Sequence, residues 1–426
     1  MALTKAISLF VTLAGLGCVL FCAGCGSKRD TRTEVVFWAF GQEGERVAKL
    51  MPEFERGNPG IKVRVQMIPW NAAHEKLLTA FAGQSLPDMC QLGNTWIPEF
   101  SLLGAIEDLR VWVARSTNVH GSSYFPGIWD TNMIDSMLFG VPWYVDTRVL
   151  FYRTDLFAKV GYTKPPRSWS EWFDLSAKLK RRDPENYAIF FPTNNEFAPP
   201  LILGLQMNSP LLKDHNTRSD FSGKEFVEAM RAFHDFFKNG WAPVKTTQIV
   251  NVYQSFAEGL YAMYITGPWN IGEFSRRLPD SLQDAWMTTP LPGPDSSIGV
   301  SLAGGSSLVI FKPSKHKPEV WKVIEFLSEP PQQLELYRLT GDLPARMEAW
   351  KDSSLASNKY AVPFFEQLKH VRATPKVPEW EQIAQKLREY SELIAMDRMT
   401  VTQAMAALDR DVDLILEKRR WMLSGQ

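Results

Sequence analysis

The stretch GVPWYVDTRVLFYRTDLF, residues 140–157, decides how this chain is expected to fold. It opens with a Gly-Val-Pro turn and contains two short apolar runs, rich in aromatic and β-branched residues, that are typical of buried strands. A polar triplet at 146–148 separates them. A strand that is buried, then exposed and then buried again is expected where a chain crosses between two lobes. The sequence therefore predicts two lobes around a cleft, with Trp143, Tyr144 and Asp146 facing the gap.

The length and charge of the chain agree with a two-lobed, soluble globular protein. At 426 residues it exceeds the size of one ordinary core. Hydrophobic residues make up 45% and charged residues 22%. Lysine plus arginine and aspartate plus glutamate balance at 47 each. Because nucleic-acid binding calls for a clustered basic excess, we expect no nucleic-acid partner.

Tryptophan is unusually frequent, with 15 residues. A large core would account for many of them. However, Trp38, Trp96, Trp143 and Trp269 stand beside turn residues and not in helical stripes. This position makes them candidate platforms on which a flat ligand face could stack.

The first 24 residues have the pattern of a secretory signal peptide. Lys5 gives a basic start, and an apolar run at 7–21, too short for a comfortable membrane span, is followed by Cys22-Ala23-Gly24-Cys25. The last three residues resemble the bacterial lipobox, although Cys22 replaces the usual leucine. The resemblance implies cleavage before Cys25, lipidation of its thiol and a polar tether over 25–33. The alternative is an uncleaved anchor.

Cysteine usage leaves a single thiol in the mature chain. Cys18 and Cys22 leave with the signal peptide and Cys25 would be lipidated, so Cys90 has no partner for a disulfide. Cys90 lies in an apolar, strand-like segment. Buried cysteines of this kind are usually inert, so we expect no catalytic role for it.

The segment after the tether alternates between strands and helices. Strands are predicted at 35–40, 61–68 and 86–92, and helices at 44–56, 72–82 and 96–103. This order predicts a mostly parallel sheet covered by helices. Ligands of such sheets bind outside the carboxyl ends of the strands, which here are the segments 38–43 and 93–96.

A second α/β lobe is predicted after the crossing. A helix at 169–181 has a capping box formed by Ser168 and Glu171. Strands at 188–191 and 261–265 each lead into a polar and aromatic loop, at 192–197 and 267–270. A second crossing is expected at 290–294, followed by a strand at 301–310. A third crossing is expected at 343–346, and two long helices follow it at 380–396 and 402–421.

Four motifs, in order, resemble the extracellular solute-binding proteins of bacterial ABC importers, in the carbohydrate-binding group typified by maltose-binding protein. They are LPDMCQL with GNTW, GVPWYVDTRVLFYRTDLF with PPRSWSEW, FAEGLYAMYITGPW, and LAGGSSLVIFKPSKHK with GDLPAR. The loop PTNNEF also resembles the Pro-Thr-Asn-Glu-Trp segment of a disaccharide-binding subset, with Phe197 replacing the tryptophan.

The resemblance implies an α/β, two-lobed periplasmic-binding-protein fold of type II, in which a hinge of two to three crossing strands joins the lobes. Lobe one would comprise residues 34–145 and 298–343, and lobe two residues 146–297 and 344–426. It also implies a lipid-anchored, extracytoplasmic and monomeric receptor that closes on a sugar and delivers it to the permease subunits of an importer. No catalytic residue, metal or cofactor is expected.

A sugar presents paired hydroxyls and one apolar face, so its site needs carboxylates, amides and aromatic rings. The residues expected to bind it are Trp38, Gln42, Glu43, Asn94, Trp96, Trp143, Tyr144, Asp146, Asn195, Glu196, Trp269, Gly304, Gly305 and Arg346. Trp269 is the preferred stacking platform. The two glycines would let backbone N–H groups approach the ligand closely.

Each of these residues also has a purely structural interpretation. Asp146 could form a strand-end salt bridge with Arg148, and Trp269 could cap the core. Glu43 could be a helix N-terminal carboxylate, and Arg346 could form an ion pair between the lobes. Trp38 could pack under the sheet, and the paired glycines could be a bulge.

Other function classes remain open. A lipid-anchored glycoside hydrolase could use the carboxylates of Glu43, Asp146 and Glu196 as acid and base, although the sequence has no Gly-x-Ser-x-Gly or His-Glu-x-x-His motif. A binding protein for iron or an amino acid would need tyrosine and histidine ligands or an Arg-Asp pair. A purely structural lipoprotein would not need polar and aromatic residues at every strand end.

Overall fold

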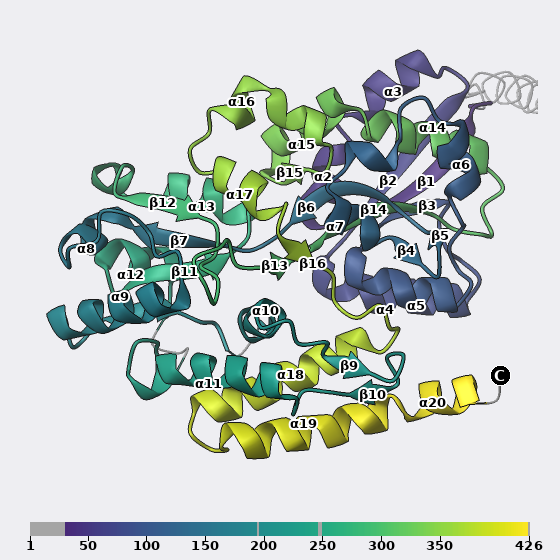
Figure 1. Cartoon of the computed structure of the whole chain (residues 1–426). Helices are drawn as coiled ribbons and strands as arrows, with labels where there is room; N and C mark the ends of the chain where they lie inside the picture. The colour runs from purple at the N-terminus through teal and green to yellow at the C-terminus, as the bar shows by residue number, and fades with distance from the viewer. Residues whose placement is uncertain (1–29, 194–195, 246–248, 425–426) are drawn as a thin grey trace, which may run out of the picture.

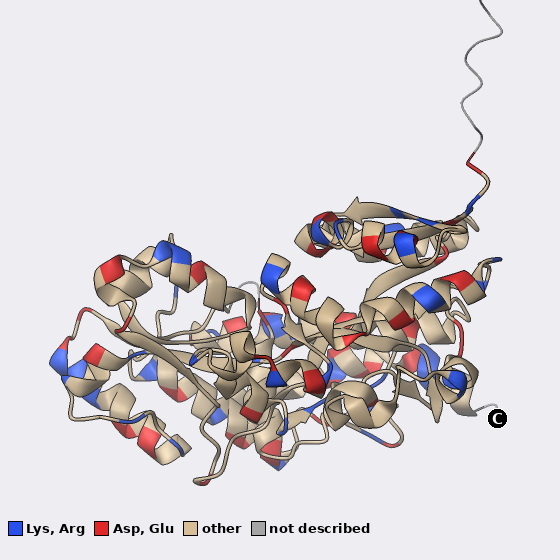
Figure 2. Cartoon of the chain, turned by 90° about the horizontal axis from the view of Figure 1, so that it is seen from above, with Lys and Arg blue, Asp and Glu red and all other residues tan. Residues whose placement is uncertain are grey.

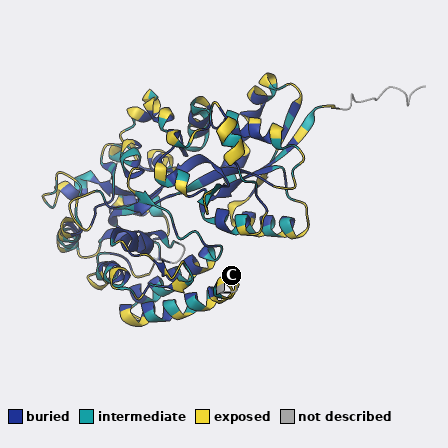
Figure 3. Cartoon of the chain, turned by 45° about the vertical axis from the view of Figure 1, so that its right-hand side comes forward, coloured by how far each residue is buried: buried dark blue, intermediate teal, exposed yellow. Residues whose placement is uncertain are grey.

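The computed structural model describes residues 30–193, 196–245 and 249–424, which form two α/β lobes built on separate sheets (Figure 1). The central strands of both sheets are largely buried, whereas the edge strand at 61–68 is partly exposed and the outer helices expose one face (Figure 3). Acidic and basic residues are interspersed over the helices of both lobes (Figure 2). Within these ranges no helix combines the length and the apolar character needed to cross a bilayer.

The first sheet has the strand order β15-β6-β14-β3-β1-β2. Its strands are β1 (Thr33–Phe40), β2 (Ile61–Ile68), β3 (Met89–Gly93), β6 (Val141–Asp146), β14 (Gly304–Ile310) and β15 (Leu343–Pro344). β1 is parallel to both β2 and β3, as the alternation of strands and helices predicts. β14 returns from late in the sequence and is antiparallel to its neighbours β3 and β6, and β15 is antiparallel to β6. The first sheet is therefore mixed, whereas the order of its first elements predicts a mostly parallel sheet.

The predicted helix at 44–56 is in fact two helices, α2 (Gly41–Val47) and α3 (Met51–Gly57). Pro52 explains the break. A proline has no N–H to donate to the carbonyl four residues earlier, and its ring would clash with that carbonyl. The backbone tightens instead, with N–H groups of Lys49 and Leu50 donating to carbonyls three residues back.

The other helices of the first lobe surround its sheet. They are α4 (Trp70–Ala82), η1 (Asn94–Trp96), α5 (Ile97–Leu102), α6 (Arg110–Arg115), η2 (Gly121–Ser123), α7 (Pro126–Asp130), α14 (Lys317–Leu327) and α15 (Pro330–Thr340). A small hairpin, β4 (Met133–Ile134) and β5 (Met137–Leu138), lies among them. Cys90 lies on β3 in the interior, and burial raises the pKa of its thiol.

The second sheet has the order β12-β7-β11-β8. Its strands are β7 (Val149–Arg153), β8 (Tyr187–Phe190), β11 (Tyr261–Thr266) and β12 (Trp286–Thr289). The helices around it are α8 (Thr154–Ala158), α9 (Trp169–Arg182), α10 (Ala198–Gln206), α11 (Lys224–Lys238), α12 (Val252–Glu258), α13 (Trp269–Arg277), η4 (Asp280–Leu282), α18 (Trp380–Ala395), α19 (Val401–Ile415) and α20 (Glu417–Ser424). A second small hairpin is formed by β9 (Leu212–Lys213) and β10 (Arg218–Ser219).

The crossing predicted at 140–157 is confirmed. The opening stretch forms β6 in the first sheet and β7 in the second, with Thr147 and Arg148 between them. The segment 290–294, predicted as a second crossing, instead stays with the second lobe, where the Trp169 N–H donates to the Gly293 carbonyl. The strand predicted at 301–310 is divided, because β13 (Ser301–Leu302) pairs with β16 (Val371–Arg372) and β14 with the first sheet. The third crossing is β15, where Leu343 pairs with Val145.

The segment after the third crossing packs against both lobes. It contains η5 (Met347–Lys351), α16 (Ser353–Ala356) and α17 (Val362–Gln367). Trp350 and Phe365 contact Phe125 of the first lobe, while Tyr360 stacks on Trp286 of the second sheet at 3.8 Å between ring centroids. Aromatic packing therefore connects the lobes behind the crossing strands.

Candidate functional site

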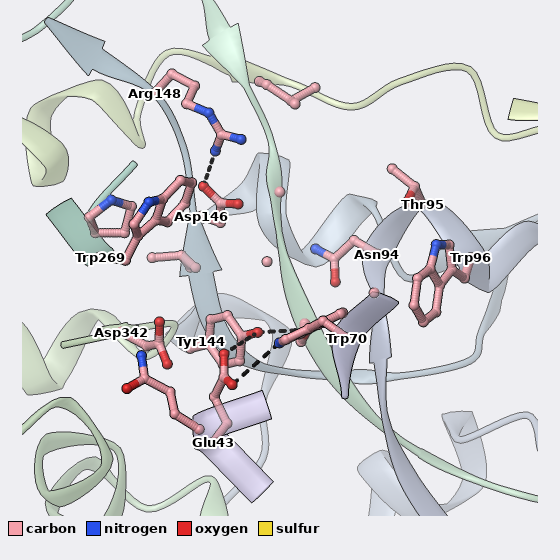
Figure 4. A pocket seen from close by; sticks show the side chains of 18 of the residues that line it. Glu43, Trp70, Asn94, Thr95, Trp96, Tyr144, Asp146, Arg148, Trp269 and Asp342 are labelled. Atoms are coloured by element: carbon pink, nitrogen blue, oxygen red, sulfur yellow. Dashed lines mark hydrogen bonds and ion pairs between the residues drawn. The ribbon is translucent and has the colours of Figure 1, made fainter. Parts of the chain in front are cut away.

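A pocket of about 510 Å³ lies between the lobes, beside the crossing strands (Figure 4). Its volume falls within the range of small-molecule sites, about 300–1,000 Å³. It is lined by Gln42, Glu43, Trp70, Gly93, Asn94, Thr95, Trp96, Tyr144, Val145, Asp146, Arg148, Phe197, Pro268, Trp269, Leu302, Gly304, Gly305, Ser306, Asp342 and Glu381. The first lobe thus provides strand ends and helix starts, and the second lobe provides residues of α13 and α18.

Aromatic rings form two walls of the pocket. Trp70 and Trp96 stand on the first-lobe side, with ring centroids 5.8 Å apart, and Trp269 stands on the other. Trp70 and Trp269 each have a relative exposure of 37%, although large aromatic side chains are usually well covered. Two partly exposed indole rings in one cleft are suited to contact the apolar face of a bound molecule.

The position of Trp269 follows from the Gly-Pro pair before it. Pro268 is the N-cap residue directly before α13, and the indole ring folds back over Gly267 so closely that a Cβ there would lie 2.0 Å from the ring. The guanidinium of Arg148 lies over the same ring, 4.7 Å from a ring centroid. A cation at this distance from a tryptophan face is attracted by its quadrupole.

A buried polar network forms the floor of the pocket. The Tyr144 hydroxyl donates to the Glu43 carboxylate at 3.1 Å and accepts from the Gln91 amide at 2.9 Å. The indole N–H of Trp70 donates to the other Glu43 oxygen at 3.4 Å. Burial raises the pKa of Glu43, and these hydrogen bonds act in the opposite direction.

Asp146 fits both of its interpretations, as a residue of the ligand pocket and as the partner of Arg148 in a salt bridge. The two side chains form an ion pair, and both line the pocket. Arg148 also contacts Glu196 of the second lobe at 3.3 Å. Burial raises the pKa of Asp146, although Arg148 opposes this shift. One arginine in the crossing therefore connects carboxylates from both sides.

The side-chain amide of Asn94 uses its oxygen but not its NH2 group in hydrogen bonds to the described residues. Its Oδ1 accepts from the Ser307 hydroxyl at 3.1 Å, whereas its Nδ2 is buried without a hydrogen-bond partner among the described residues. An unpaired buried donor is costly, about 1–3 kcal/mol. Because Asn94 lines the pocket, this amide is a candidate donor for a ligand oxygen.

The paired glycines bring β14 close to β6. A Cβ on Gly305 would lie 2.3 Å from the Tyr144 carbonyl oxygen, and one on Gly304 would lie 2.7 Å from that of Asp146. Gly305 also has φ +129°, a region that favours glycine. The register of the β6–β14 pair shifts just beyond them, so they are part of an irregular ladder as well as of the pocket wall.

Most of the predicted ligand-binding residues are brought together in this pocket: Gln42, Glu43, Asn94, Trp96, Tyr144, Asp146, Trp269, Gly304 and Gly305. Glu196 lies just outside it, joined to it through Arg148. Asn195 falls outside the described residues, as does the predicted lipidation site Cys25.

Trp38, Trp143 and Arg346 are not among the lining residues. Trp143 is 1% exposed and packs against Phe37 in the core of the first lobe. Trp38 is 8% exposed, with Lys76 over its ring. The Arg346 guanidinium donates to the carbonyls of two first-lobe residues and pairs with Glu348. Strand alternation explains why Trp38 and Trp143 lie outside the pocket, because successive side chains of β1 and β6 point to opposite faces of the sheet.

Several lining residues were missed. Trp70 begins α4 after a proline, and Asp342 follows Gly341, so the same signal that selected Trp269, an aromatic or acidic residue beside a turn, could have found both. Arg148 was considered only as a partner of Asp146. Glu381 lies within the long helix α18, where no local signal separates it from other surface glutamates.

Comparison with known proteins finds a matching family model and a similar solved structure. Residues 41–334 match the family model described as bacterial extracellular solute-binding protein. A solved structure described as the sugar-binding protein MalE from the phytopathogen Xanthomonas citri is 49% identical, covers 92% of this chain and 100% of its own, and superposes with a TM-score of 0.90.

More distant relatives are similar over most of their lengths. A galactooligosaccharide-binding protein from Bacillus subtilis is 24% identical over 95% of this chain and 96% of its own. A diacetylchitobiose binding protein, DasA, from Streptomyces coelicolor is 25% identical over 79% of this chain and 78% of its own. These proteins differ in their named ligands.

Proposed function

The chain belongs to the bacterial extracellular solute-binding proteins, and on this premise we propose that it is a receptor that binds a disaccharide or short oligosaccharide between its lobes and delivers it to an ABC importer. The observation that supports a sugar most strongly is the pocket itself. Two half-covered tryptophan faces, Trp70 and Trp269, enclose a floor of carboxyl and amide groups, some of which lack partners. Apolar sugar faces and sugar hydroxyls need these two kinds of surface.

Closure of the lobes would let the importer distinguish the sugar-bound receptor from the free one. Trp269 and Glu381 belong to the second lobe, whereas Glu43 and Asn94 belong to the first. Only a closed state lets both groups contact one ligand, so the ligand stabilises that state. The importer's permease subunits would recognise the closed form. We propose lobe boundaries at 34–145 plus 298–343 and 146–297 plus 344–426, and a monomer in solution.

The pocket residues do not, in this proposal, cleave the sugar. The proposed receptor role rests on family membership and on the pocket, and a glycoside hydrolase is the alternative that a single experiment separates from it. We expect one disaccharide from a panel of maltose, trehalose, sucrose, cellobiose and lactose to raise the melting temperature of the mature protein. Ligand at 100 times its Kd adds about 2.7 kcal/mol to the folded state.

The outcome of the panel is decided by two readouts. A melting shift with the sugar recovered intact supports a receptor. Recovery of cleaved sugar would contradict it in favour of a hydrolase. A shift only with an amino-acid mixture or ferric citrate would keep the fold and discard the sugar.

We further propose that Cys25 carries the lipid that holds the receptor at the outer face of the cell membrane. A single acyl chain anchors weakly and two or more anchor stably. Replacement of Cys25 by alanine should therefore move the protein from the detergent phase to the aqueous phase in a Triton X-114 partition of expressing cells. A Cys90→Ala variant is the control and should stay in the detergent phase, because Cys90 is buried in β3.

A further inference from the structure

Two carboxyl side chains face each other on one side of the pocket, Glu43 and Asp342 (Figure 4). Glu43 lies in the first turn of α2. Asp342 is held by the end of α15, where Gly341 turns the chain with φ +86°, and by β15, which pairs Leu343 with Val145. Each of the two carboxyl residues has a relative exposure of only 6%.

The hydrogen bonds distinguish the two carboxyls. Both oxygens of Glu43 accept a hydrogen bond, one from Tyr144 and one from Trp70, as an ionised carboxylate requires. The Oδ2 atom of Asp342 is buried and has no partner among the described residues. The two side chains are also within hydrogen-bonding range of each other. Because the Glu43 oxygens already accept from Tyr144 and Trp70, Asp342 is the member of the pair that is better placed to hold a proton.

The charges around the pair agree with this assignment. Tyr144 and Asp146 face it from β6 and Thr340 faces it from α15, and none of them is a cation. The one cationic side chain among the residues that line the pocket, Arg148, is paired with Asp146 and Glu196. Burial and the nearby Glu43 charge raise the pKa of Asp342 to about 8.

The pocket is also short of free donors on this side. The Tyr144 hydroxyl and the Trp70 indole N–H already donate to Glu43, and the Gln42 amide donates to the Thr340 carbonyl at 3.5 Å. The free amide of Asn94 belongs to a different wall, formed by η1. A sugar hydroxyl both donates and accepts, and two ionised carboxylates would offer it acceptors only. A protonated Asp342 next to an ionised Glu43 offers one donor and one acceptor.

We propose that Asp342 and Glu43 form a carboxyl pair holding one proton, in which Asp342 donates to a sugar oxygen and Glu43 accepts from a sugar hydroxyl, so that sugar binding is linked to proton uptake. This inference rests on the proposed function, because it concerns the same pocket. It adds a specificity residue, Asp342, and predicts that binding depends on pH.

The direction of the linkage follows from the donor role. A ligand that accepts from protonated Asp342 raises the pKa of this carboxyl further, so binding takes up protons where the free pair has begun to lose its own. Affinity should be nearly constant below about pH 7. It should weaken about tenfold for each pH unit once the pH passes the pKa of the free pair and before that of the complex.

Calorimetry in two buffers measures the proton directly. The disaccharide that gives the largest melting shift in the panel is titrated into the wild-type protein at about pH 8 in phosphate and in Tris, whose ionisation heats differ. We expect the binding heats to differ by a net uptake of about half a proton per sugar. Equal heats in the two buffers, or proton release, would overturn the proposal while leaving the receptor function intact.

Two variants locate the effect. In Asp342→Asn the amide still donates but cannot titrate, so sugar should bind near neutral pH with no difference between the buffers. Asp284→Asn is the matched control, because Asp284 is 99% exposed in its pair with Lys359 and does not line the pocket. It should keep the wild-type uptake. An uptake that persists in Asp342→Asn would contradict the assignment.

A measurement without sugar keeps the proposal testable if no sugar of the panel binds. An acid whose pKa is raised in the folded state loses stability as pH rises from its unfolded value, about 4, to the folded value. The melting temperature of the wild type minus that of Asp342→Asn should therefore fall between about pH 4 and about pH 8 and then level off. A difference that does not change with pH would exclude the shared proton.

Discussion

Trp143 and Trp269 show how much the surroundings of one residue type can differ. Each follows a proline, and each was expected to face the ligand. Trp143 is 1% exposed in the core of the first lobe, whereas Trp269 is 37% exposed in the pocket. The sequence could not separate them, because strand alternation decides which side chains of β6 point into the lobe, and the register of β6 depends on β14, which lies far along the chain.

Replacement of Trp269 by alanine should weaken sugar binding and leave the fold intact. The ring supplies an apolar face in the pocket, and loss of such an aromatic anchor costs about 2 kcal/mol, roughly 30-fold in Kd. Isothermal titration calorimetry would measure the Kd, and thermal melting would measure the stability. Trp421→Ala is the control, because Trp421 is 76% exposed outside the pocket and its loss should not change the Kd. Unchanged affinity of Trp269→Ala would place the sugar elsewhere.

Replacement of Trp143 by alanine should have the opposite profile. The side chain is fully buried against Phe37 and Tyr144, so its removal leaves a cavity and costs about 3–5 kcal/mol of unfolding free energy. Urea unfolding of the mature protein would measure this loss. A loss of less than about 1 kcal/mol would show that the first-lobe core does not depend on this ring.

At the scale of elements, local signals predicted most strands and helices, and contacts distant in the sequence decided the rest. The β-α-β-α-β order and the crossing from β6 to β7 were predicted correctly, because apolar runs and turn residues mark them, whereas the segment predicted to cross at 290–294 stays with the second lobe. The predicted helix at 44–56 failed at Pro52, a break that the sequence contains. Helix α10 was not predicted, since all nine of its residues are buried and it has no amphipathic pattern.

The meeting of some pocket residues could not be predicted from their neighbours in the sequence. Asp342, Glu43 and Tyr144 come together only because β15 and β14 return to pair with β6. Nothing near residue 342 in the sequence indicates the glutamate at 43. The strand end that carries Asn94 was predicted because ligands of parallel sheets bind there in general. Asp146 was predicted because it interrupts the two apolar runs of the crossing stretch.

The close approach of β14 to β6 gives a prediction at this scale. Gly305→Ala should lower the free energy of unfolding by about 1–3 kcal/mol, because φ +129° is strained for alanine and its Cβ would contact the Tyr144 carbonyl oxygen. Gly272→Ala in α13 is the control. It meets no atom within 4 Å and should stabilise the helix by about 1 kcal/mol. Chemical unfolding would measure both variants, and equal stabilities would contradict the account of the ladder.

At the scale of the whole molecule, the arrangement of groups on both sides of one pocket implies motion. Arg148 in the crossing contacts Asp146 and Glu196, which lie on opposite sides of it. The segment with Trp350 and Tyr360 packs on both lobes behind the crossings. Few covalent connections and a shared pocket are the conditions under which a ligand shifts an open–closed equilibrium.

Small-angle X-ray scattering of the mature protein, with and without a saturating disaccharide from the panel, tests the central claim most directly. We expect a smaller radius of gyration with the sugar. At a sugar concentration only a few times the wild-type Kd, we expect little change for Trp269→Ala, because its roughly 30-fold weaker binding leaves it mostly unbound. Identical radii for the wild-type protein with and without a sugar that calorimetry shows to be bound would contradict closure of the lobes on the ligand.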